Sequence, residues 1–230
     1  SFGVDEIDCV TLKTPFHFCC KNDRTCLHRS EVCDGYVQCK HSVDDEELCD
    51  ISQCPQYCQC IGFALDCTGS FLFTVPEYSL NIRAAILRRS NLKHWKQGKV
   101  CFKFMHRLDL SYNNLAQINY HSFTTFPYLW ELNLSHNNLS IIQAKSFQGL
   151  RFLRILAVIG NVFFLILPYS FDGLTSVMKL NLSGTQILFV QSRAFYKMEM
   201  LSFLDLSKNR LHTIEKDTFF CLEKLKCLNV

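Results

Sequence analysis

A period of 24 residues runs through the second half of the chain and restricts its fold more than any other sequence feature. Asparagine recurs at this spacing, with threonine in one slot, and phenylalanine recurs ten residues further on. The two series are Asn113, Asn137, Asn161, Thr185 and Asn209, and Phe123, Phe147, Phe171, Phe195 and Phe219. A fixed period of this length indicates stacked structural units rather than one closed core.

Each copy also carries a short alternation of apolar and polar residues just before the asparagine position. These pairs are Leu108/Leu110, Leu132/Leu134, Leu156/Val158, Leu180/Leu182, Leu204/Leu206 and Leu228/Val230. A period of two predicts a short strand with its leucines turned inward. The asparagine side chain can bond backbone groups where the chain turns. Since one coil cannot bury its own apolar face, the coils must stack into a solenoid. A degenerate earlier copy is visible at Ala85, Leu87 and Leu92.

Cysteine and charge divide the chain into two parts. Of the 14 cysteines, 11 fall in the first 67 residues, which indicates an oxidised, extracellular N-terminal region. Residues 1–50 carry 11 acidic and 5 basic side chains, whereas residues 51–230 carry 10 acidic and 19 basic ones. An acidic module therefore precedes a basic one. The net charge of +3 is weak evidence for nucleic-acid binding, and we expect no nucleic-acid partner.

The repeat pattern resembles leucine-rich repeats, which implies an α/β-type solenoid with a curved parallel sheet. Directly before it, Cys54-Pro55, Cys58, Cys60 and Cys67 resemble the N-terminal cap of extracellular leucine-rich-repeat proteins. This resemblance implies the disulfides Cys54–Cys60 and Cys58–Cys67. A zinc site is the rival interpretation of these spacings, but the proline and the cysteine-rich context favour disulfides. We expect a cap over residues 54–67 and a truncated repeat array over 68–230, without a C-terminal cap.

Residues 9–49 form a separate cysteine-rich segment, too short to fold without covalent staples. Its seven cysteines are Cys9, Cys19, Cys20, Cys26, Cys33, Cys39 and Cys49, and spacing alone does not choose their pairing. The string resembles the low-density-lipoprotein receptor class A module. That resemblance implies Cys9–Cys26, Cys20–Cys39 and Cys33–Cys49, with Cys19 as the odd thiol.

The class A resemblance also implies one bound calcium ion, for which carboxylates are suitable hard ligands. Asp34, Asp45 and Glu46 match the ligand acids, and the carbonyls of Glu31 and Tyr36 match the backbone ligands. Gln38 stands where the family usually has aspartate, and one residue is inserted after Cys39. An amide oxygen can still ligate, so a weaker site is predicted. The alternative is that these acids form a solvated surface.

One class A module, a short linker at residues 50–53 and a capped repeat array together resemble the ectodomain of type C leucine-rich-repeat G-protein-coupled receptors, the relaxin-family peptide receptors among them. The resemblance implies a location on the extracellular side of the plasma membrane. It also implies that the solenoid captures a peptide or protein hormone and that the N-terminal module activates the receptor's own transmembrane domain. The alternatives are a secreted or matrix adhesion protein and, less favoured, a single-span innate-immune receptor.

The outward positions of the predicted strands are the candidate ligand contacts. The resemblance implies that acidic residues on this face, here Asp109, Glu131 and Asp205, hold basic residues of a hormone. Lys179 and Phe203 lie on the same face, and the alternative is that all five are ordinary solvated residues. A denser basic cluster comprises Arg88, Arg89, Lys93, Lys96, Lys99, Lys103 and Arg107. It could meet a sulfated glycan, an acidic ligand or the acidic first module, although a solvated surface is the favoured interpretation.

The remaining motifs are less informative. Asn133, Asn138 and Asn181 begin N-x-Ser glycosylation motifs, and Asn138, in a predicted turn, is the best candidate. Cys101, Cys221 and Cys227 have no assigned partner, although a Cys221–Cys227 bridge is conceivable. The sequence contains no nucleophile–base constellation and no glycine-rich phosphate loop, so we expect neither an enzyme nor a small-molecule substrate.

Overall fold

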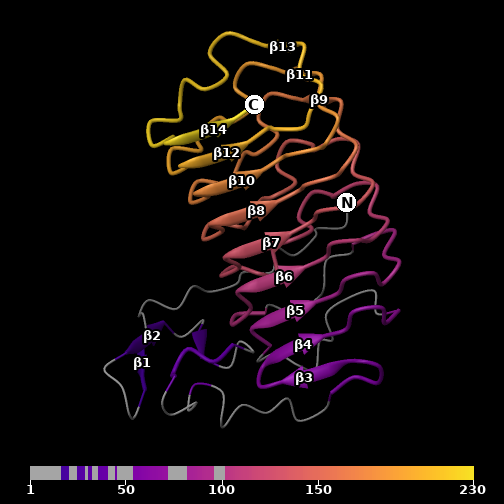
Figure 1. Ribbon diagram of the computed structural model, residues 1–230, viewed down its shortest axis with the longest axis vertical. Coiled ribbons are helices and arrows are strands. Elements are labelled where there is room, and N and C mark those ends of the chain that lie inside the picture. Colours follow the sequence, from indigo (N-terminus) through magenta and orange to yellow (C-terminus); the bar gives the residue numbers. More distant parts are fainter. Residues whose placement is uncertain are drawn as a thin grey trace, which may run out of the picture.

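The computed structural model describes residues 17–20, 25–28, 31–32, 36–40, 45, 54–71, 82–95 and 102–230. From residue 54 onward these ranges form short strands joined by turns, wound into a stack of coils (Figure 1). The predicted linker at 50–53 lies outside the described residues. No helix among the described residues has the length and hydrophobicity needed to cross a membrane.

The main sheet contains nine strands in the order β14-β12-β10-β8-β7-β6-β5-β4-β3 (Figure 1). All neighbouring pairs are parallel except β3 and β4, which form an antiparallel hairpin. The strands are β3 Gln59–Ile61, β4 Ala64–Asp66, β5 Ala84–Ile86, β6 Arg107–Asp109, β7 Glu131–Asn133, β8 Ile155–Ala157, β10 Lys179–Asn181, β12 Phe203–Asp205 and β14 Cys227–Asn229.

The register of this sheet follows the sequence period. Leu108 of β6 pairs with Leu132 of β7, which pairs with Leu156 of β8, and each of these central leucines is fully buried. Both predictions, the inward leucines and the degenerate copy at Ala85 in β5, are confirmed. The sequence did not indicate that the cap itself joins the sheet, where Leu65 of β4 pairs with Ala85.

The opposite side of the solenoid differs from the α/β-type expectation, because its return segments contain no α-helix in any described part of the chain. Turns predominate there, and the last copies add a three-stranded parallel sheet of β9 Leu165–Ile166, β11 Phe189–Val190 and β13 Thr213–Ile214. Each return segment has a left-handed residue two positions before the repeated phenylalanine. These residues, with φ between 56° and 67°, are His121, Lys145, Tyr169, Arg193 and Asp217. A left-handed residue interrupts a right-handed helix, so the segments remain turns.

The repeated phenylalanines stack into a continuous column inside the coils. Their ring centroids lie 6.3, 6.1, 5.7 and 6.0 Å apart from Phe123 to Phe219, and the interplanar angles are 7–10°. Stacked aromatic pairs add about 0.5–1.5 kcal/mol each beyond the area they bury. The phenylalanine series therefore joins each coil to the next.

The repeated asparagines bond backbone groups where the chain turns, as predicted, and the stacked copies form a ladder of side-chain to backbone hydrogen bonds. Asn137 Nδ2 donates to the carbonyl oxygens of Leu110 and Leu134, both at 3.0 Å, and its Oδ1 accepts from the backbone N–H of Leu115 at 3.1 Å. Two of these partners belong to the preceding coil, so the amide links neighbouring coils. Thr185 has a single hydroxyl, which donates to Leu182 O at 2.8 Å.

The N-terminal part is a small stapled unit. β1 (His17–Cys19) and β2 (Cys26–His28) pair in antiparallel fashion, and Cys20, Leu27 and Cys39 form a small buried cluster. Its Cys20–Cys39 disulfide, and the cap's Cys54–Cys60 and Cys58–Cys67, are the pairs that the family resemblances imply. Cys26 is disulfide-bonded, whereas Cys9, Cys33 and Cys49 lie outside the described residues.

Candidate ligand-binding face

The first and third residues of each strand point away from the core and form what we call the sheet face. β6 and β7 place Asp109 and Glu131 on it, β10 adds Lys179, and β12 adds Phe203 and Asp205. The five predicted contacts therefore share one face. They fall into two groups, on β6–β7 and on β10–β12, with β8 between them. The two groups differ in how far their charges are already paired.

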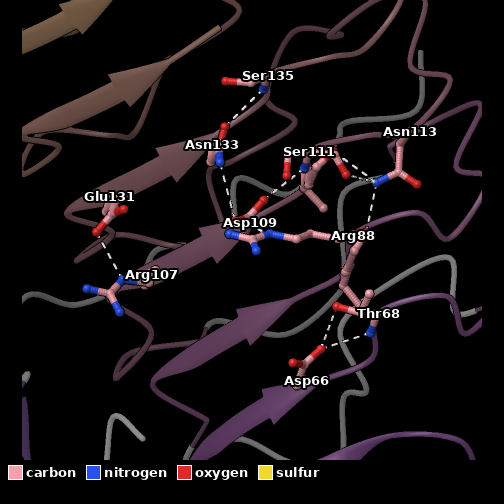
Figure 2. A network of polar contacts seen from close by, with 12 residues as sticks. Asp66, Thr68, Arg88, Arg107, Asp109, Ser111, Asn113, Glu131, Asn133 and Ser135 are labelled. Carbon is pink, nitrogen blue, oxygen red and sulfur yellow. Dashed lines mark hydrogen bonds and ion pairs between the residues drawn. The ribbon is translucent and has the colours of Figure 1, made fainter. Parts of the chain in front are cut away.

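Asp109 is only 5% exposed and is bound within the chain (Figure 2). Its Oδ2 accepts from Arg88, with Nη2 at 2.6 Å and Nε at 2.8 Å, and its Oδ1 accepts from the backbone N–H of Ser111 at 2.9 Å. This hydrogen bond to Asp109 raises the pKa of Arg88 above its ordinary value. The predicted ligand contact at Asp109 is thus a carboxylate with little surface and several partners, which favours a structural role.

The bond from Asp109 to Ser111 recurs along the sheet. Asn133 Oδ1 accepts from Ser135 N at 3.0 Å, and Asp205 Oδ1 accepts from Ser207 N at 2.9 Å (Asn133 in Figure 2). Aspartate and asparagine commonly bond the backbone two residues on, where a strand turns. In the sequence, this turn is marked by the pattern Leu-Asp-Leu-Ser or Leu-Asn-Leu-Ser, with the acid or amide between the two leucines. This geometry explains the N-x-Ser motif at Asn133 structurally, while Asn138 is exposed outside the strands and stays the best glycan candidate.

Glu131 is paired less tightly. Its Oε2 accepts from Arg107 Nε at 2.9 Å, and both side chains keep 34% of their surface exposed (Figure 2). The guanidinium of Arg107 also lies 4.7 Å from the ring centroid of Tyr36 in the N-terminal segment. An exposed pair of this kind contributes little to stability, so either partner can exchange for a ligand group at small cost.

The group on β10 and β12 is open. Lys179 is exposed, Phe203 and Asp205 are half-buried, and Ile155 and Ala157 of β8 lie beside them. Two ion pairs are formed by the residues that the structure describes, Arg88–Asp109 and Arg107–Glu131, and neither involves Lys179 or Asp205. This part of the face therefore offers one cation, one anion and apolar surface to a partner.

The predicted basic cluster is partly neutralised. Arg88 is bound to Asp109, and Arg107 to Glu131. The Arg89 guanidinium lies 5.3 Å from the centroid of the Tyr112 ring, and Lys93 and Lys103 are exposed. The two remaining members, Lys96 and Lys99, lie outside the described residues.

The predicted calcium ligands are only partly described. Asp45 is fully buried, and its Oδ2 accepts from the backbone N–H groups of Gln38 at 2.6 Å and Cys39 at 3.2 Å. Glu31, Tyr36 and Gln38 are described, whereas Asp34 and Glu46 are not. Among the described residues, no group of three His, Cys, Asp or Glu side chains could hold a metal. A buried carboxylate suits the hard-donor chemistry of calcium, and the ion stays a prediction.

The remaining cysteines are not joined where the structure describes them. Cys221 is half-buried and Cys227 is exposed, and both are free thiols, so the conceivable Cys221–Cys227 bridge is absent. Cys101 and the side chain of Cys19 lie outside the described residues.

Comparison with known proteins identifies the repeats. Residues 105–163 and 175–230, together half of the chain, match the family model described as leucine rich repeat. The chain belongs to the leucine-rich repeat family. A crystal structure of a TLR13–ssRNA13 complex is similar over 68% of this chain, with a TM-score of 0.53 and 20% identity. At that identity the likeness shows the leucine-rich-repeat fold alone, and this chain covers 26% of that longer chain.

Membership of the leucine-rich repeat family agrees with the geometry of the sheet face. An array of short parallel strands presents a broad surface on which many side chains meet one partner. Such a leucine-rich-repeat scaffold serves ligand or protein interaction rather than catalysis. The disulfides Cys20–Cys39, Cys54–Cys60 and Cys58–Cys67 are typical of a domain folded in an oxidising, extracellular environment.

Proposed function

We propose that this chain is the ligand-capturing part of a cell-surface receptor, and that its sheet face binds a peptide or protein hormone. The observation that carries the proposal is the group of Lys179, Phe203 and Asp205 on β10 and β12, which forms no ion pair with any described residue. Protein interfaces concentrate their binding energy in apolar and aromatic anchors that polar groups surround. Here Phe203 is the aromatic residue, and Lys179 and Asp205 are the polar groups beside it on the sheet face.

The surroundings extend the apolar surface. Met178 and Met200 are 40% and 38% exposed and lie close to the start of β10 and β12. Methionine adapts its shape to a partner, which suits it to binding surfaces. We assign Phe203 as the anchor, Asp205 as the acceptor of a ligand cation and Lys179 as the donor to a ligand carboxylate. Asp109 is left out of this set because its carboxylate is already bound to Arg88.

The N-terminal segment has the second role in this proposal. A short linker keeps the stapled N-terminal unit close to the repeats. It therefore also keeps this unit at a high effective concentration near the membrane domain of the receptor. We propose that the receptor is G-protein-coupled, of the type C leucine-rich-repeat class, and that this segment activates its transmembrane domain. The parent transcript tests this: seven apolar stretches of about 20 residues downstream would support it. A stop codon after a C-terminal cap would instead support the secreted or matrix adhesion protein.

The binding site itself can be tested without knowing the hormone. A phage-displayed peptide library is selected on the immobilised chain, and the enriched peptides are measured against variants. Phe203→Ala is expected to weaken binding about tenfold or more, the usual cost of removing an aromatic anchor. Phe164→Ala is the control, because Phe164 is 55% exposed but precedes β9 on the opposite side. Equal losses for the two variants would contradict the proposed site.

A further inference from the structure

We infer that the start of strands β5–β7 is a docking site for the chain's own N-terminal segment, and that Arg107 couples this docking to the ligand face. Two contacts between described residues join the N-terminal segment to the repeats. The guanidinium of Arg107 lies 4.7 Å from the centroid of the Tyr36 ring, and Arg83 Nη1 donates to the backbone oxygen of Val32. In Figure 1 the strands β1 and β2 lie to the left of β4 and β5.

The two parts also line a small, partly open cavity. Its volume is about 110 Å³, and its walls combine the N-terminal segment with the repeats. Its lining includes Glu31 and Gln38 from the N-terminal segment and Arg107, Trp130 and Glu131 from the repeats. Side chains from sequence positions some 70 to 100 apart therefore line one cavity. A mere tether would not produce such an arrangement.

Charge supports the same docking. Residues 1–50 have six more acidic than basic side chains, and residues 51–230 have nine more basic than acidic ones. Opposite net charges on two tethered parts raise the population of their contact. The contact itself uses cations of the repeats against an aromatic ring and a carbonyl, both favourable partners for a guanidinium.

Arg107 connects the docking site with the sheet face. The same guanidinium that contacts Tyr36 donates from Nε to Glu131 Oε2 at 2.9 Å (Figure 2 shows the pair). A ligand cation that binds Glu131 competes with Arg107 for this carboxylate. Arg107 is then no longer held in place by Glu131, and its contact with the Tyr36 ring is weakened. By linkage, release of the segment then favours ligand binding to the same degree. This second step rests on the proposed function, whereas the docking does not.

Tryptophan fluorescence tests the docking directly. The chain has two tryptophans; Trp95 is 3% exposed in the core, and Trp130 lines the cavity. In a Trp95→Phe background, Trp130 is the single reporter, and acrylamide quenching measures its exposure. Tyr36→Ala is expected to raise the quenching constant about twofold, because the cation–π contact is lost. Val37→Ala is the matched control, since Val37 and Tyr36 are both 54% exposed.

The outcomes separate the two steps. If acrylamide quenches Trp130 equally in Tyr36→Ala and Val37→Ala, and both variants keep the far-UV circular dichroism of the parent, the docking proposal is wrong. This holds whether or not the sheet face binds a ligand. If docking holds, a library-selected peptide should raise Trp130 quenching in the parent but not in Glu131→Gln. A peptide that binds and leaves quenching unchanged contradicts the coupling alone. Failure to select any peptide contradicts the proposed function and leaves the docking result standing.

Discussion

Gly160 lies directly against the imidazole of His136: a Cβ built on Gly160 would sit 2.6 Å from His136 Nδ1. The same imidazole stacks on the Tyr112 ring, with centroids 4.4 Å apart. The three residues occupy equivalent turn positions in successive coils, each with positive φ. The absence of a side chain at Gly160 is therefore what allows His136 to stack as it does.

Gly160→Ala should destabilise the array more than Gly184→Ala. Both glycines have similar left-handed φ values, +64° and +61°, so both variants carry about 1–2 kcal/mol of backbone strain. Only at Gly160 does the new methyl group also meet His136, since nothing lies within 4 Å of the Cβ position at Gly184. Urea unfolding of the two variants measures the difference. Adding His136→Ala to Gly160→Ala should reduce the further loss of unfolding free energy to that of Gly184→Ala. A larger remaining loss would contradict the assigned contact between Gly160 and His136.

Thr185→Asn should stabilise the chain by about 1 kcal/mol through one or two added buried hydrogen bonds. Asn161, one coil earlier, donates to Leu134 O at 3.0 Å and accepts from Leu139 N at 3.1 Å, and the equivalent partners at position 185 are Val158 O and Phe163 N. The free energy of unfolding is the measurement. The reverse change in the ladder, Asn161→Thr, should cost a similar amount, and a gain from both changes would contradict the ladder interpretation.

Asp109→Asn should reduce stability by about 1–2 kcal/mol, whereas Asp205→Asn should have almost no effect. Asparagine can keep the bond to the backbone N–H two residues on in both cases. Only the Asp109 change removes an ion pair, and the loss is moderate because Arg88 keeps 48% of its side-chain surface exposed. Thermal unfolding measures stability. Binding of a selected cationic peptide should show the opposite order, with Asp205→Asn the weaker binder.

Calcium should protect the N-terminal segment specifically. If Asp34, Asp45, Glu46 and their backbone partners hold one ion, adding Ca²⁺ to the whole chain should slow amide hydrogen exchange at residues 36–40. Amides of β8 and β10 serve as the internal control and should not change. Asp45→Asn should abolish the effect. Equal exchange in Ca²⁺ and in a chelator would show that the assigned ligands are wrong.

Prediction from sequence succeeded where one short pattern repeats. The inward leucines, the asparagine ladder and the phenylalanine column each follow from a side-chain type recurring at a fixed period. The helical element implied by the α/β-type expectation was wrong for the described residues, because residues such as His121 adopt positive φ without being glycine. The side-chain types at these positions, which differ from coil to coil, do not mark a left-handed residue.

The amino-acid sequence by itself determined that this chain stacks coils with a period of 24 residues and presents a row of outward side chains, since local patterning sets both strand and register. Only the tertiary structure decided which of those side chains are available. Asp109 and Asp205 are equivalent in the pattern, yet Arg88, from another coil, occupies the first. Pairing depends on which charges the stacking brings within reach, and that geometry exists only once the coils have assembled.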